Sequence, residues 1–399
     1  MEYPDRRNTY KLTTEEYEKI LAFKRDLHMH PELSGKEVRT TEKIREFLSE
    51  IPSIEILPLP VNTGLVARLR GEGAGPEVML RADIDALPQT EQVESPYKSQ
   101  NPGVMHACGH DFHTASLLGG ILLLERARKD GAFQGTADFV FQPAEEGTTG
   151  ARMMIDAGLF DLIHPGCCFG MHNWPSVRTG NIVCHEGPLM SAKRNLEIHI
   201  FGAGGHGSMP HLNIDPIVCA GAMVQSLQTV VSRNINPLDS VVLSINMIQG
   251  GSPVNLVVDR VMMKATIRSL SESALDRAIE RVETIVEKTA QAYECRSEIL
   301  WNERIPSVWN SPEMTKIAKE CAAATGCRVT DAPPSLASED FSLYRSFAPS
   351  FFYWVGSTAE GDTVEELHRP KFCTDDTALH YGAQLYAASV LEMIHIYKS

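Results

Sequence analysis

Short apolar runs alternate with amphipathic segments along the first half of the chain, and this alternation constrains the fold most strongly. Strand-like apolar runs occur at 64–69, 77–80, 137–141 and 166–170. A helical period of apolar residues occurs over 13–30, 36–49 and 114–129. Because apolar strands separated by helices are typical of a sheet that is covered on both faces, the sequence predicts an α/β fold.

The character of the sequence changes near residue 190. From there, strand patterns at 196–200, 240–247, 258–269 and 295–300 enclose helix patterns at 215–232 and 275–292. This β-α-β-β-α-β order is that of the ferredoxin-like split unit. A chain of 399 residues is also too long to fold around one ordinary hydrophobic core. We therefore predict a catalytic domain formed by 1–189 and 302–399, interrupted by an inserted α+β domain at 190–301.

The composition indicates which classes of protein, partner and cellular compartment the chain fits. Hydrophobic residues make up 43% and charged residues 22% of the chain, as in soluble globular proteins. The net charge of -14 would repel phosphate, so nucleic acid is not expected as a partner. The polar start, residues 1–7, predicts no secretory signal, and no apolar run is long enough to predict a membrane helix. Nine irregularly spaced cysteines favour free thiols in a reducing cytoplasm over a disulfide framework.

One stretch, Met-His-Ala-Cys-Gly-His-Asp-Phe-His at 105–113, concentrates metal-binding side chains. It places a thiol, three imidazoles and a carboxylate close together. Sulfur and imidazole ligands suit zinc, nickel, cobalt or manganese better than calcium or magnesium. Cys108 on its own would fit equally well as a small buried apolar residue, so the stretch needs support from elsewhere in the chain.

That support comes from polar clusters that follow the predicted strands. Asp83 and Asp85 end one strand, Glu145 and Glu146 follow the next, and His172 follows the run at 166–170. Since ligands of open α/β sheets bind at the carboxyl ends of the strands, these clusters would converge on one crevice. Singly, each is more often a solvated turn or a surface residue. Jointly, and with the later Leu-His-Arg-Pro at 367–370, they indicate a two-metal hydrolase site.

A rival interpretation comes from Gly-Ala-Gly-Gly-His-Gly at 202–207, which matches the pattern G-x-G-x-x-G after a strand. A dinucleotide site of this kind also needs an acidic residue roughly 20 positions further on. The segment 220–226 contains none. The glycines instead suit a loop that passes close to a substrate or to a neighbouring subunit.

With these motifs in order, the chain resembles the co-catalytic metallo-amidohydrolases, the family of hippurate hydrolase, aminoacylases and plant auxin-conjugate hydrolases, which are relatives of glutamate carboxypeptidase. The matching blocks lie at 25–34, 81–88, 106–113, 142–147, 171–175, 202–211, 265–268, 338–341 and 368–372. The resemblance implies a zinc-exopeptidase-like catalytic domain with a central mixed sheet. It also implies that the inserted domain serves as a lid and mediates dimerisation through its edge strand.

The resemblance further implies roles for single residues. The metal ligands would be Cys108, His110, Glu146, His172 and His368. They would hold two divalent ions per subunit, with zinc or manganese expected first and nickel or cobalt as alternatives. Where the peptidase branch has a metal-binding histidine, this chain has Asp83, which is therefore not counted as a ligand.

Five further residues also receive implied roles. Glu145 would be the general base, and Asp85 would orient a ligand histidine. His206 would stabilise the oxyanion, typically from the inserted domain of the neighbouring subunit. Arg268 would hold the substrate carboxylate, and Asn255 would make a polar contact with the substrate.

The expected reaction is hydrolysis of N-acyl or N-aroyl amino acids to a carboxylic acid and a free amino acid, by a homodimer or higher homo-oligomer. A dipeptidase or metallo-carboxypeptidase is the nearest alternative, and hydrolysis of benzoyl-glycine against a plain dipeptide would separate the two. A non-catalytic metal-binding protein of the same fold is the alternative from another class. The sequence does not specify the acyl group or the physiological metal.

Overall fold

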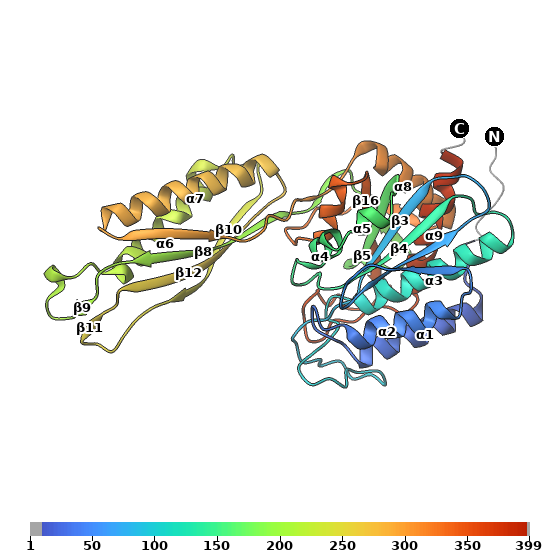
Figure 1. Cartoon of the computed structure of the whole chain (residues 1–399), viewed down its shortest axis with the longest axis horizontal. Coiled ribbons are helices and arrows are strands. Elements are labelled where there is room, and N and C mark those ends of the chain that lie inside the picture. The colour runs from blue at the N-terminus through green and yellow to red at the C-terminus, as the bar shows by residue number, and fades with distance from the viewer. Residues whose placement is uncertain (1–9, 397–399) are drawn as a thin grey trace. The chain divides into compact units, whose positions relative to one another are not determined.

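The computed structural model describes residues 10–396, which form two compact units (Figure 1). The first unit contains the described residues up to Gly187, then Trp309–Pro333, and the segment from Asp340 onward. The second contains Pro188–Val308 and Pro334–Glu339. The prediction of no secretory signal rests on residues 1–7, which lie outside the described residues. Within 10–396, no helix combines the length and the apolar character that crossing a membrane requires.

The first unit is built on an eight-stranded sheet with the strand order β1-β2-β4-β3-β5-β16-β6-β15. The strands are β1 (Ile54–Leu57), β2 (Leu65–Arg70), β3 (Glu77–Asp83), β4 (Thr136–Gln142), β5 (Cys167–Arg178), β6 (Asn181–Val183), β15 (Arg328–Thr330) and β16 (Ser350–Thr358). The central strands β4, β3, β5 and β16 are parallel, whereas β1 and β2 run antiparallel to their neighbours. The predicted α/β fold with a central mixed sheet is confirmed.

Helices pack against this sheet. They are α1 (Thr14–Met29), α2 (Val38–Ser49), α3 (His110–Lys129), α4 (Gly150–Asp156), α5 (Leu159–Leu162), α8 (Pro312–Thr325) and α9 (Ala378–Ile396), with a 3-10 turn η2 (Asp340–Ser346). Helix α3 lies directly against α9 at Gly119 and Gly120, where an added Cβ would come within 2.6 Å of Ala383 and 2.8 Å of Tyr386. The two glycines therefore allow the backbones of the two helices to approach closely.

Two boundaries differ from the sequence prediction in ways that matter for function. Helix α3 begins at His110, whereas the sequence pattern predicted residue 114. The pattern missed the first turn because its mostly polar residues break the apolar period, although their side chains are buried. Gly109 precedes it with φ of 88°, a left-handed conformation that suits glycine. Strand β5 continues to Arg178, so His172 lies within the strand and not after it.

The second unit contains a four-stranded antiparallel sheet with the order β10-β12-β8-β13. Its main elements, in chain order, are β8 (Ala192–Phe201), α6 (Pro216–Asn234), β10 (Val241–Gln249), β12 (Arg260–Ser269), α7 (Glu272–Ala292) and β13 (Arg296–Trp301). Smaller elements are β9 (Gly205–His206), η1 (Pro210–Leu212) and β11 (Leu256–Val257). Strands β7 (Gly187–Met190) and β14 (Val308–Asn310) pair with each other and span the two points in the sequence at which the units divide. Alternate residues of β8 and β12 join α6 and α7 in one apolar core, so both helices cover the same sheet face (Figure 1).

Candidate metal centre

The candidate ligands come from separate elements of the first unit. Cys108 lies in the loop before α3, and His110 is the first residue of that helix. Glu146 follows β4, His172 lies in β5, and His368 lies in the segment before α9. Because β3, β4 and β5 are parallel, the segments at their carboxyl ends meet at one edge of the sheet.

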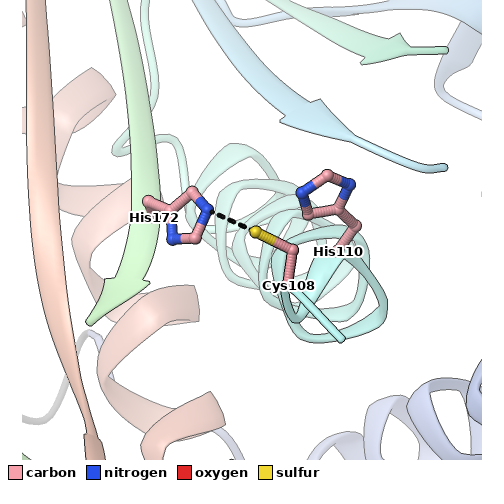
Figure 2. A group of neighbouring side chains, drawn as sticks. All are labelled: Cys108, His110 and His172. Atoms are coloured by element: carbon pink, nitrogen blue, oxygen red, sulfur yellow. Dashed lines mark hydrogen bonds between the residues drawn. The ribbon is translucent and has the colours of Figure 1, made fainter. Parts of the chain in front are cut away.

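Contacts between ligand atoms show how closely these residues meet. Cys108 Sγ lies 3.3 Å from His172 Nε2 and 3.3 Å from His368 Nε2. His368 Nε2 lies 3.3 Å from Glu146 Oε1, and His110 Nε2 lies 3.9 Å from the same oxygen. In Figure 2 the thiol of Cys108 points at His172, and the ring of His110 lies beside it. The structure thus brings all five candidate ligands into one cluster.

Glu145 belongs to the same cluster. It is buried, and together with His110 and Glu146 it forms a group whose ligand-type atoms all lie within 4.8 Å of one another. Two further groups of this kind are Cys108 with His110 and His172, and Cys108 with Glu146 and His368. These three groups overlap, because Cys108, His110 and Glu146 each belong to two of them. Ligand groups that overlap in this way are the arrangement that a site for two ions needs.

The chemistry of the cluster fits divalent cations. His110 Nε2 and Glu146 Oε1 are buried and have no hydrogen-bond partner among residues 10–396, which is costly unless another group satisfies them. Burial and the nearby carboxylates of Glu146 and Glu145 raise the pKa of the Cys108 thiol well above its usual range. A bound cation would reverse that effect and favour the thiolate.

Hydrogen bonds fix which ring nitrogen two of the candidate ligand histidines, His172 and His110, offer. His172 Nδ1 donates to the backbone oxygen of Asn173 at 2.6 Å, so Nε2 carries the lone pair that faces Cys108. Asp85 accepts from His110 Nδ1 at 3.1 Å, which leaves His110 Nε2 for an ion. Asp85 also accepts from the backbone N–H of Glu146 at 3.0 Å and from Ser34 Oγ at 2.6 Å. Asp85 therefore contacts the ring of one candidate ligand, His110, and the backbone of another, Glu146.

Sequence reasoning included Arg81 and His113 in the motifs at 81–88 and 105–113 but predicted no role for either residue. Arg81, Asp83 and His113 are fully buried, and Asp83 accepts hydrogen bonds from both Arg81 and His113. Asp83 and His113 were visible as parts of polar clusters, at a strand end and within 105–113. No motif shows that residues from these two clusters contact each other.

A second buried network lies beside the start of α3. His28 Nδ1 contacts Asp111 at 2.9 Å and Nε2 contacts Glu91 at 3.3 Å. Burial disfavours the charged ring, but the two carboxylates outweigh burial and raise the pKa of His28 to about 9. When folding raises the pKa of a histidine, the histidine stabilises the fold fully at pH values below its pKa in the unfolded state. This contribution is lost as the pH rises through its pKa in the folded state.

We therefore expect the free energy of unfolding of the metal-free protein to fall between pH 6.5 and about 9, with His28 contributing about 3 kcal/mol to the decline. His28→Gln cannot take up the proton, so its decline over this range should be smaller. Urea unfolding of both proteins at the two pH values measures the difference. Equal declines in the two proteins would contradict the assignment.

The remaining candidate residues lie in the second unit. His206 is exposed on β9 and pairs with Leu256 of β11, next to Asn255, whose backbone oxygen accepts from Gly207. Arg268 is half-buried on β12 and donates to the backbone oxygen of Leu336 at 3.0 Å; burial lowers its pKa. Within this unit the structure brings His206 and Asn255 together. It does not bring Arg268 to them, because β9 and β11 adjoin the start of β12 and Arg268 stands near its end.

Comparisons with known proteins show which proteins this chain is similar to. The family model described as peptidase family M20/M25/M40 matches residues 79–392. An N-acetylcysteine deacetylase of Bacillus subtilis (strain 168) is 42% identical over 370 residues, which cover 92% of this chain and 95% of the relative. Thermostable carboxypeptidase 1 of Saccharolobus solfataricus is 36% identical over 375 residues, covering 92% of this chain and 93% of the relative. A solved structure of a dinuclear metal-binding peptidase of the M20 family from Bacillus subtilis superposes with a TM-score of 0.83 at 38% identity, covering 96% of this chain and 99% of the other.

Proposed function

The chain belongs to peptidase family M20/M25/M40 and is a hydrolase of amide C–N bonds, and we propose that it removes the acyl group from N-acyl amino acids with the help of two divalent metal ions. The observation that carries this proposal is the cluster of a thiol, three imidazoles and a carboxylate around the buried Glu145. The name of the Bacillus subtilis deacetylase supports a small N-acyl amino acid as substrate. The identity of the metal stays open between zinc, manganese, nickel and cobalt.

The proposed ligands are those of the cluster described above: Cys108, His110, Glu146, His172 and His368. Ions held there would polarise the amide carbonyl and lower the pKa of water. Glu145 would accept a proton from the attacking water and deliver it to the leaving nitrogen as the C–N bond breaks. The products are a carboxylic acid and the free amino acid. Asp85 would keep the His110 ring in place during this exchange.

Residues of the second unit complete the proposal. His206 is proposed to donate to the developing oxyanion, for which its exposed imidazole is suited. Arg268 is proposed to bind the carboxylate of the amino acid, because a guanidinium can form two parallel hydrogen bonds with it. Asn255 is proposed as a polar substrate contact. The residues therefore divide into an ion-holding set in the first unit and a substrate-binding set in the second.

The oligomeric state and the cellular compartment are proposed from two other features, an edge strand and the free cysteines. Strand β10 is an edge strand of the second unit, and its Met247 and Ile248 are 42% and 56% exposed. Such an edge can pair with the same edge of a second copy, which supports a homodimer. All nine cysteines are free thiols, which supports a reducing compartment such as the cytoplasm.

Removal and return of metal tests the proposed function directly. Enzyme treated with a chelator is expected to lose hydrolysis of N-acetylcysteine, and one or more of zinc, manganese, cobalt and nickel should restore it. Release of free amino acid is measured over N-acetyl, N-benzoyl and long-chain N-acyl amino acids, with plain dipeptides alongside. Restored cleavage of dipeptides only would favour a peptidase, for which the carboxypeptidase relative supplies the precedent. No release from any compound, with metal bound, would favour the non-catalytic alternative.

A further inference from the structure

We infer that His113 is a positioning residue for the candidate metal centre, which it reaches through the peptide that joins His172 to Asn173. The inference rests on the proposed metal-dependent function, since His172 is one of the proposed ligands. His113 stands on the first turn of α3, whereas His172 and Asn173 belong to β5. Its ring therefore connects the helix that carries His110 with the strand that carries His172.

The hydrogen bonds of His113 define its protonation state. The backbone N–H of Asn173 donates to His113 Nε2 at 2.9 Å. Because a peptide N–H can only donate, Nε2 carries the lone pair and the proton resides on Nδ1. That proton is donated to Asp83 Oδ1, 2.5 Å away. His113 lies within a group of potential ligands with Asp83 and His110, yet both of its nitrogens are engaged and no lone pair is left for an ion.

Asp83 is itself held in a fixed position. Arg81 Nη1 donates to Asp83 Oδ2 at 2.7 Å, and both side chains are completely buried. The same guanidinium donates to Gln142 at 2.9 Å and to Asp340 at 3.1 Å. A buried carboxylate with a charged partner and a second donor is the kind of anchor that keeps a histidine in one tautomer and one orientation.

Asn173 is fixed from the opposite side as well. Its backbone oxygen accepts from His172 Nδ1, and the rings of His113 and His172 pack edge to face with centroids 4.5 Å apart. The Asn173 side chain presses against Gly109, where an added Cβ would lie 2.2 Å from Asn173 Oδ1. Gly109 joins Cys108 to His110 in the chain. Asn173 thus contacts both ligand-bearing segments, and His113 holds its backbone in place.

Two substitutions distinguish the hydrogen bond between His113 and Asp83 from the one between His113 and Asn173. In His113→Asn the shorter amide can still bond Asp83 but cannot reach the Asn173 N–H. In His113→Gln the amide oxygen can occupy the place of Nε2 and accept from Asn173. We expect His113→Asn to release bound Co²⁺ to a chelator 10- to 100-fold faster than the wild type, the size of effect usual for groups that orient ligands. His113→Gln should release it at a rate closer to the wild type.

The absorption spectrum of the cobalt-loaded protein supplies a readout that does not depend on activity. The band that arises from cobalt and the Cys108 thiolate should shift in His113→Asn and much less in His113→Gln. Tyr353→Phe serves as the control, because it removes another buried hydrogen bond, to Ser389 Oγ at 3.2 Å, on the same sheet but outside the cluster. Its release rate and spectrum should match the wild type. Circular dichroism of the metal-free proteins verifies that each variant is folded.

The outcomes are distinct. Wild-type release rates and spectra in both His113 variants would overturn the inference, and so would equal impairment of both, since the Asn173 contact would then not be the cause. A wild-type protein that binds neither Co²⁺ nor zinc, manganese or nickel would overturn the proposed function and the inference with it. Normal cobalt binding by the wild type with an unaffected His113→Asn would overturn the inference alone.

Discussion

Replacement of Glu145 by glutamine is expected to lower the turnover number by a hundredfold or more while metal content stays at the wild-type level. Glutamine has nearly the same shape as glutamate but cannot accept and return a proton. Glu145 is buried within the cluster beside His110 and Glu146, which is where a proton from the attacking water would be taken up. Turnover of N-acetylcysteine and metal content per subunit are measured on the same preparations.

The matched control for this variant is Glu360→Gln, the same change at an exposed position of the first unit. It should leave turnover unchanged. If Glu145→Gln retained turnover near that of Glu360→Gln, another group would have to serve as the base. If it instead lost metal, Glu145 would act as a ligand and its assignment as the base would have no support.

Cys108→Ala is expected to lose most of the bound metal and, with it, nearly all activity. The thiol lies within 3.3 Å of nitrogens of both His172 and His368, so it is central to the ligand set. Alanine removes the sulfur and leaves the surrounding imidazoles and carboxylates without their shared partner. Metal content after gel filtration and activity with added metal provide the measurement.

Cys167→Ala is the control for this substitution, because Cys167 is also a buried thiol but lies at the start of β5, in the apolar core. The expected cost is limited to a loss of packing, with metal content unchanged. Full metal occupancy and normal activity in Cys108→Ala would remove Cys108 from the ligand set. Equal metal loss in both variants would point to a general effect on the fold.

The central sheet could be predicted because the apolar runs in the first half of the chain are short and regular. The rule that ligands gather at the carboxyl ends of parallel strands then predicts Glu145, Glu146 and His172 in one region. The structure has these three residues in one cluster. Local sequence patterns sufficed here because each cluster stands directly beside the strand that positions it.

Other features depend on contacts that no local pattern encodes. The first turn of α3 is polar and completely buried, so apolar periodicity missed it. The hydrogen bond that Asp83 accepts from His113 joins a strand to a helix, and this pairing becomes visible only in three dimensions. The pKa of His28 likewise depends on Glu91 and Asp111, which are distant in the sequence.

One of these long-range contacts determines when, during synthesis, the whole cluster can assemble. Cys108 and His368 meet although 260 positions separate them, and α3 packs on α9 at the far end of the chain. A ribosome must therefore translate 260 positions beyond Cys108 before the thiol can meet the His368 imidazole. Until then the nascent polypeptide lacks one residue of the proposed ligand set, so the complete proposed set could hold metal only after His368 has been translated.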